Sequence, residues 1–252
     1  MSIPLLRGLG TLLLLGVGQQ ALSQPARADS SLVAAATRSL RQEYASALGS
    51  QSRLYNGPEY VDYVRRNTQG HRFFASTEPQ PATIAYAGHT YTNVPLLYDL
   101  VRGVLVLTAP GGGLQLQLLN EQVTRFTLDE HSFVRIVADS SGDAPMRTGF
   151  YDLLVDGQVQ LLAARRKKLN VRTSAGSVES EITASNEYFV CKNHQYYRVD
   201  KLATVLRLFP ESKVALRDYA RNNKLEFGTD RRELALEALI RYLATLATSP
   251  PN

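Results

Sequence analysis

Two aspartates stand inside apolar segments of the chain. An acidic side chain there needs either a hydrogen-bonding or ionic partner or a position on a solvent-exposed face. Asp99 and Asp152 each follow a tyrosine and precede a leucine, in the segments YDLVRG (98–103) and YDLLVDG (151–157). An acid is unusual in an apolar strand unless it is paired or faces water. If the two segments form adjacent hairpins, Asp99 and Asp152 could approach each other and supply acid–base chemistry.

Two interpretations of this pair are open. A hydrolase that cleaves glycosides would need its carboxylates roughly 5–9 Å apart in an open cleft, and nothing in the sequence supplies a cleft. The other interpretation is that both acids lie on an outer face or bind turn amides and nearby arginines. We therefore predict no catalytic residue, and a hydrolase of envelope carbohydrate or lipid that uses Asp99 and Asp152 is the alternative function.

A run of four basic residues, at positions 165–168, contains no acid. Such a run could contact phosphate groups of envelope lipid or an acidic polysaccharide, or it could be a solvated strand end that discourages aggregation between sheet edges. Tyrosines on neighbouring hairpins could line a groove or pack across strands. The predicted binding residues are Tyr98, Asp99, Tyr151, Asp152, Arg165 and Arg166.

Several common kinds of chemistry lack their sequence signals. There is no GxSxG, HExxH, P-loop or dinucleotide motif. None of the four histidines stands two to four residues from another, so a zinc site would need ligands from distant segments. The single cysteine, Cys191, excludes an intramolecular disulfide, and it is expected to be a small buried hydrophobe. The sequence predicts neither a cofactor nor a metal.

The middle of the chain alternates apolar and polar residues with a period of two. Hydrophobic residues make up 44% of the chain and charged residues 20%, which is typical of a globular protein. The turns between the alternating segments are mostly short, and short turns force antiparallel neighbours. We therefore predict an α+β fold whose antiparallel β-meander is a curled sheet, barrel-like or a sandwich. The predicted strands are 83–87, 89–94, 96–101, 104–108, 114–118, 123–128, 132–137, 149–155, 158–164, 188–192 and 195–199.

Helices are predicted at both ends of this meander. Leucines and other apolar residues recur every three to four positions in 29–48, and a shorter helix is expected at 58–70 because Pro58 suits a first helical position. After the last strand the helical period returns in 201–209, 211–222 and 231–247. The predicted sheet is thus flanked by N-terminal and C-terminal helices.

The first 23 residues have the pattern of a secretory signal peptide. Arg7 precedes an apolar stretch, and small residues stand at Ala21 and Ser23. Removal of this segment leaves 27 basic against 23 acidic residues, a net charge of +4 (28 − 1 = 27; 27 − 23 = 4). We predict a periplasmic or extracellular protein with no transmembrane segment that does not bind nucleic acid. The predicted organisation is 1–23 signal peptide, 24–75 N-terminal helical segment, 76–200 antiparallel β domain and 201–248 C-terminal helices that pack on the same domain.

Five segments together resemble an exported protein family of Bacteroidota-type bacteria. They are YNGPEY (55–60), NVPLLYDL (93–100), HSFV (131–134), GFYDLL (149–154) and ARNNKLEF (220–227). The resemblance spans about 54–243 and implies export from a cell with two membranes. That family has no assigned activity, so the resemblance transfers no catalytic residue. The predicted function is that of a non-enzymatic envelope protein that binds an apolar ligand, a glycan or a partner protein, with envelope lipid also a candidate, through its β-sheet.

Overall fold

A computed structural model describes residues 49–109, 112–138, 145–174 and 177–248. They belong to the second of two compact units of the chain, Leu48–Asn252. The predicted signal peptide and the helix expected at 29–48 lie outside the described residues.

Ten strands form one antiparallel sheet. They are β1 Gln80–Tyr86, β2 His89–Asp99, β3 Val104–Thr108, β4 Gln115–Gln117, β5 Val123–Leu128, β6 His131–Ile136, β7 Gly149–Val155, β8 Gln160–Ser174, β9 Ser177–Lys192 and β10 Gln195–Val199. Their order in the sheet is β10-β9-β8-β7-β6-β5-β1-β2-β3-β4. Every pairing except that of β1 with β5 joins neighbours in the sequence, because short turns return the chain beside its last strand. The predicted antiparallel meander is confirmed.

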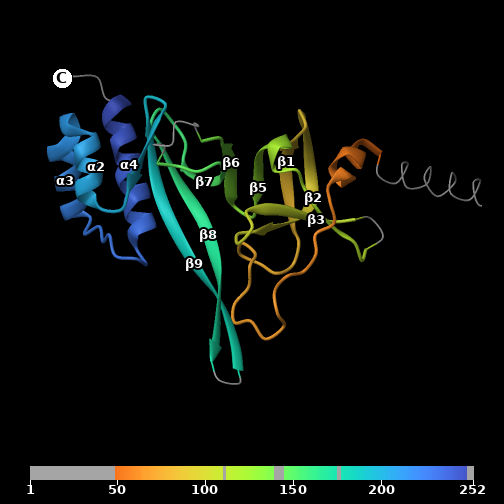
Figure 1. The fold of residues 1–252 in the computed structure, drawn as a ribbon. Coiled ribbons are helices and arrows are strands. Elements are labelled where there is room, and N and C mark those ends of the chain that lie inside the picture. Colours follow the sequence, from red (N-terminus) through yellow and green to blue (C-terminus); the bar gives the residue numbers. More distant parts are fainter. Residues whose placement is uncertain (1–48, 110–111, 139–144, 175–176, 249–252) are drawn as a thin grey trace, which may run out of the picture. The chain divides into compact units, whose positions relative to one another are not determined.

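The sheet is open and not strongly curled, so the expectation of a curled, barrel-like or sandwich arrangement is wrong. β4 and β10 are its two edges, and neither pairs with a further strand in the described part of the chain. In Figure 1 the helices gather beside β8 and β9. Because these helices cover the apolar face of the C-terminal strands, that half of the sheet needs no second sheet to bury it.

The C-terminal helices are confirmed as α2 Leu202–Leu208, α3 Lys213–Asn222 and α4 Arg232–Thr248, with a short 3-10 turn η3 Pro210–Ser212 between the first two. The break follows from Pro210, which cannot continue a helix. The apolar stripe of α4 is buried, and it packs with side chains of β7, β8 and β9 in one cluster. Members of that cluster include Leu236, Leu239, Ile240, Leu243, Val155, Leu161 and Val190.

The helix predicted at 58–70 does not form. A 3-10 helix, η1 Gly49–Asn56, precedes an irregular segment that runs beside the edge strand β4. There the Tyr60 amide donates to the Gln115 carbonyl (2.8 Å), and the Gln117 amide donates to the Pro58 carbonyl (2.8 Å). These bonds to another strand satisfy backbone groups that a helix would satisfy internally.

β8 and β9 are longer than predicted and form a hairpin that extends past the rest of the sheet (Figure 1). The sequence indicated strand only up to 164 and again from 188. In the segment between, polar residues stand next to one another as well as at every second position. The sequence therefore shows no period of two there. Fifteen cross-strand pairs nevertheless hold the hairpin together, from Gln160 with Cys191 to Ser174 with Ser177.

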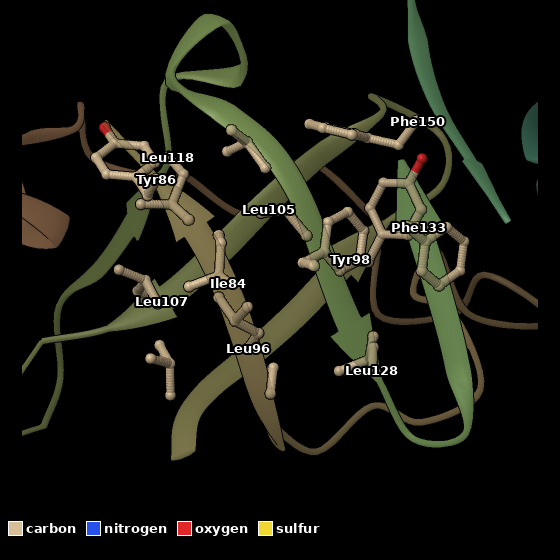
Figure 2. Close-up of a cluster of buried hydrophobic side chains, with 14 of the residues drawn as sticks. Ile84, Tyr86, Leu96, Tyr98, Leu105, Leu107, Leu118, Leu128, Phe133 and Phe150 are labelled. Atoms are coloured by element: carbon tan, nitrogen blue, oxygen red, sulfur yellow. The ribbon is translucent and has the colours of Figure 1, made fainter. Parts of the chain in front are cut away.

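The first half of the sheet carries an aromatic and aliphatic core, shown in Figure 2. The Tyr98 ring lies edge-on to Phe133 (5.3 Å between centroids) and to Phe150 (5.9 Å). Tyr98 is on β2 and Phe150 on β7, with β1, β5 and β6 between them in the sheet order. The end of β2 therefore lies near the start of β7, although three strands separate them in the sheet order.

Candidate functional site

The six predicted binding residues occupy four different environments. Five of them are buried, and Arg166 is half-buried. Asp99 and Asp152 belong to separate hydrogen-bond networks, Tyr151 is a core residue, and three of the six line a common pocket. Those three are Tyr98, Arg165 and Arg166.

Asp99 is an anchor for the turn that follows β2. Its Oδ1 accepts the amides of Val101 (2.8 Å) and Arg102 (3.0 Å). Its Oδ2 accepts the hydroxyls of Tyr60 (2.6 Å) and Tyr63 (2.8 Å). The side chain is fully buried. A carboxylate with four donors and no solvent contact fixes local structure and has no free oxygen to exchange protons with a substrate.

The two tyrosines around Asp99 stay protonated. Burial raises the pKa of Tyr60 and of Tyr63, and the hydrogen bond that each donates to Asp99 raises it further. Arg72 completes this group, since its Nε donates to the Tyr60 hydroxyl (2.8 Å). Both hydroxyls are therefore donors in a fixed network rather than bases.

Asp152 lies at the centre of a second network that connects the sheet to α4. Its Oδ2 accepts from Arg165 through Nη2 (2.6 Å) and Nε (3.0 Å) and pairs with Nδ1 of His131 (2.7 Å). The Arg165 guanidinium also binds Glu233 at the start of α4, through Nη2 and Oε1 (2.8 Å) and through Nη1 and Oε2. The Tyr188 hydroxyl donates to the same Glu233 carboxylate (2.9 Å).

Arg165 and His131 hold their charges differently in this network. Burial alone would lower the pKa of Arg165, but its bonds to Glu233 and Asp152 raise it, so the guanidinium is charged. The hydrogen bond to Asp152 raises the pKa of His131, although burial opposes the shift. The His131 side chain is 35% exposed and that of Arg165 only 8%, so solvent reaches the imidazole more readily than the guanidinium.

The structure does not bring the two aspartates into one site. They share no hydrogen-bond partner, and three strands separate β2 from β7 in the sheet order. Tyr151, the neighbour of Asp152, uses its hydroxyl to donate to the Arg147 carbonyl (2.7 Å) and to accept the Arg147 amide (3.1 Å). These contacts identify Tyr151 as a structural residue.

The pocket that does collect predicted residues is rich in arginine. It has a volume of about 230 Å³ and lies where the end of β2, the start of β7 and the middle of β8 meet. We call it the arginine pocket. Its lining residues are Tyr98, Leu100, Val101, Arg102, Gly103, Asn120, Glu121, Arg135, Thr148, Gly149, Phe150, Arg165 and Arg166.

The four arginines of this pocket differ in how much of their charge is already paired. Arg165 is bound to Asp152 and Glu233. Arg102 lies over the Tyr63 ring, with its guanidinium carbon 3.6 Å from the centroid. Among the described residues, the Arg166 guanidinium has one long contact, 3.5 Å to the Tyr151 hydroxyl, and the Arg135 guanidinium makes no hydrogen bond or ion pair. The pocket thus contains guanidinium donors for which the described ranges supply no acceptor.

The four residues of the basic run have separate roles. Arg165 is in the buried network and Arg166 in the pocket. The Lys167 ammonium donates to the carbonyls of His71 (2.8 Å) and Phe73 (2.6 Å), which fastens the irregular segment to β8. Only Lys168 is exposed, so the run as a whole is not a solvated strand end.

Sequence reasoning missed Arg102, Arg135 and Asn120. Arg102 stands within the YDLVRG segment but was treated as a turn residue, and no pattern marked Arg135 or Asn120. Asn120 donates from Nδ2 to the Gly103 carbonyl (2.9 Å), and its Oδ1 is buried without a partner in the described part of the chain. Lining residues come from four strands, β2, β6, β7 and β8. The pattern of residues along the sequence does not show that these strands meet at one pocket.

Other chemistry is not assembled elsewhere in the described ranges. No group of three or more histidine, cysteine, aspartate or glutamate residues there could hold a metal ion. Cys191 is buried, and burial raises the pKa of its thiol. None of the helices in the described ranges has the length and apolar character required to cross a membrane.

Comparison with known proteins adds no relative. No protein-family model, no curated protein and no solved structure matches this chain. Membership of the exported family that the sequence resembles therefore stays a prediction.

Proposed function

We propose that this protein is an exported, non-enzymatic protein of the cell envelope that binds an anionic ligand in the arginine pocket. The observation that carries the proposal is the presence of Arg135 and Arg166 in one pocket, where their side chains have almost no partners among the residues that the structure describes. Guanidinium groups form strong, charge-assisted hydrogen bonds to carboxylate and phosphate oxygens. An anion that enters the pocket would supply the missing acceptors.

The pocket differs from an ordinary charged surface because its arginines are partly withdrawn from water. Both Arg135 and Arg166 are half-buried, and a charged group loses hydration when it is buried. Like charges that converge without counter-ions repel one another as well. A bound anion relieves both costs, which is the physical reason for placing a ligand there.

The proposed location agrees with this ligand chemistry. The signal-like segment 1–23 supports export, and a net charge of +4 after its removal weakly favours anionic partners. Envelope lipids with phosphate groups and acidic glycans are both anionic. The ligand we propose is therefore an anionic group from such a molecule, rather than a purely apolar one.

The hydrolase alternative receives no support from the contacts of its two acids. Asp99 is sealed from solvent by its four donors, and Asp152 is bound to Arg165 and His131. Acid–base catalysis requires a group within hydrogen-bond reach of the substrate proton. We therefore propose binding without catalysis.

The test is a thermal-shift series with sulfate, inorganic phosphate and citrate as probes. A ligand that binds only the folded state stabilises it by RT ln(1 + L/Kd), where L is the free ligand concentration, so the unfolding temperature rises with ligand concentration. At least one probe should raise the melting temperature of the wild type, and Arg135→Gln and Arg166→Gln should each reduce that shift.

Two controls remove the same charge outside the pocket. Lys168→Gln changes an exposed residue two positions from Arg166 on β8, and Arg125→Gln changes an exposed arginine on β5. Neither residue lines the pocket, so both variants should keep the full shift. Equal loss in pocket and control variants, or no shift with any probe, would refute the proposal.

A further inference from the structure

We infer that the arginine pocket is built for a phosphate monoester attached to a hydroxylated molecule, such as a sugar or glycerol unit. This inference rests on the proposed function and narrows its ligand. Two features carry it: the net charge that the lining residues leave uncompensated, and a buried acceptor beside the arginines.

The uncompensated charge of the pocket matches a dianion. Asp152 and Glu233 carry two negative charges, which pair with two positive charges, those of Arg165 and protonated His131. The other three guanidiniums of the pocket then stand against one lining acid, Glu121. Three positive charges and one negative charge leave +2 (3 − 1 = 2). A phosphate monoester above its second pKa of about 6 carries nearly two negative charges, whereas a phosphodiester, a sulfate ester or a carboxylate carries one.

The unused hydrogen-bond groups indicate what is attached to the phosphate. Asn120 Oδ1 can only accept a hydrogen bond, and it is buried without a partner among the described residues. A phosphate dianion has no proton to donate, so this oxygen needs a hydroxyl or amine elsewhere on the ligand. A hydroxyl fits better, because an amine would be repelled by the three guanidiniums.

The pocket is also larger than a bare phosphate requires. Its volume is about 230 Å³, and two aromatic residues, Tyr98 and Phe150, line it together with Thr148. An aromatic wall beside a polar group suits the mixed surface of a small hydroxylated ring or chain. The phosphate would bind the arginines, and the attached unit would contact the aromatic wall and Asn120.

The test compares glucose 6-phosphate with glucose 6-sulfate by isothermal titration calorimetry at pH 7.5 and 5.5. The two probes share their hydroxyls and their tetrahedral group and differ in charge. At pH 7.5 the phosphate should bind at least tenfold more tightly than the sulfate. If only the dianion binds, the dianionic fraction predicts that its affinity falls about fourfold at pH 5.5.

The sulfate serves as the control for pH effects that come from the protein. The ionisable residues that line the pocket are the four arginines, Glu121 and Tyr98, and none of these types ordinarily titrates between pH 5.5 and 7.5. His131 reaches Arg165 only through Asp152, and any influence of it would change the sulfate affinity as well. The ratio of the two affinities therefore reports the charge of the ligand.

The role of Asn120 is tested with methyl phosphate, which lacks hydroxyls. Asn120→Ala should weaken glucose 6-phosphate several-fold and leave methyl phosphate unchanged, since only the first ligand donates to Oδ1. Equal weakening of both ligands would indicate a change in the shape of the pocket and would overturn the assignment of this contact.

The remaining arms identify the source of the phosphate and separate the two proposals. Vesicles with phosphatidic acid present a phosphate monoester, and vesicles with phosphatidylglycerol present a phosphodiester. Stronger binding to the phosphatidic acid vesicles would assign the ligand to lipid. Equal affinity for glucose 6-phosphate and glucose 6-sulfate at pH 7.5 would overturn the dianion inference and leave the anion pocket standing. Absence of binding by every anion would overturn both.

Discussion

Asp99 and Asp152 show how two identical short contexts lead to different physical roles. Each is a buried carboxylate after a tyrosine, but Asp99 accepts hydroxyls and turn amides, whereas Asp152 accepts a guanidinium and an imidazole. The type of partner decides the consequence. Neutral donors make the hydrogen bonds of Asp99, with Arg72 at a longer 4.0 Å, whereas directly bonded ionic partners connect Asp152 to the helices through Glu233.

Replacement of Asp99 by asparagine tests its role as an anchor. The amide keeps the shape of the side chain but removes the negative charge of the carboxylate, which accepts four hydrogen bonds in the wild type. Asp99→Asn should lower the free energy of unfolding by about 1–3 kcal/mol, since bonds to a charged group exceed neutral ones. Denaturant unfolding measures the difference.

The control for this variant is Asp129→Asn, the same chemical change at an exposed turn residue with φ of 56°. Asparagine tolerates that backbone conformation, so the free energy of unfolding should change by less than about 0.5 kcal/mol. Equal effects of the two substitutions would show that Asp99 is not an anchor.

The raised pKa of His131 predicts a specific dependence of stability on pH. The folded state holds the proton more tightly than the unfolded chain because of the bond to Asp152. This contribution is therefore complete below the unfolded pKa of about 6.5 and is lost as the pH rises through the higher folded value. The wild type should lose stability between pH 6 and 8 more steeply than His131→Gln.

The comparison of slopes isolates His131 from other histidines. Burial lowers the pKa of His71, which acts in the opposite direction but is common to both proteins. His194→Asn, at an exposed turn residue, should leave the slope at its wild-type value. A His131→Gln variant whose slope equals that of the wild type would contradict the assigned bond.

At the scale of elements, tertiary contacts override local preference in the irregular segment that follows η1. Pro58 and the apolar spacing after it favour a helix, yet the backbone bonds to β4 instead. Gly57 permits that approach, because a Cβ atom there would lie 1.8 Å from the Gln117 carbonyl oxygen. Real side chains do not tolerate such a contact.

Gly57→Ala should therefore separate this segment from β4 and lower the free energy of unfolding by about 2 kcal/mol or more. The clash is with backbone, which cannot rotate away. Gly228→Ala is the matched control: no atom lies within 4 Å of a Cβ there, so its effect should be within about 0.5 kcal/mol of zero. Hydrogen exchange should also show faster exchange at Tyr60 and Gln117 in the first variant alone.

The long β8–β9 hairpin shows the limit of pattern analysis for elements. Alternation located strands that bury one face more than the other, such as β1, because one-sided burial imposes a period of two. The outer part of the hairpin has little core to face, and Val171 is 53% exposed. Its pairing follows from cross-strand bonds rather than from burial, so the composition carries no period.

At the scale of the whole molecule, the fold class was predictable, but the form of the sheet and the arginine pocket were not. Antiparallel order follows from the turns, and the C-terminal helices follow from their apolar stripes. Closure depends on how β4 and β10 lie relative to each other, which no local pattern encodes. Arg102, Arg135 and Arg166 reach the pocket from three separate strands or turns. Of these three, only Arg166 belongs to a pattern visible in the sequence, the basic run at 165–168.

The account of function depends on whether an anion occupies that pocket in the cell. Native mass spectrometry of the protein purified from its own envelope measures this directly. We predict a co-purified anionic molecule on the wild type that is absent from the Arg135→Gln and Arg166→Gln variants and present on Lys168→Gln. A neutral apolar molecule that all four proteins retain, or wild-type protein with nothing bound, would contradict the account.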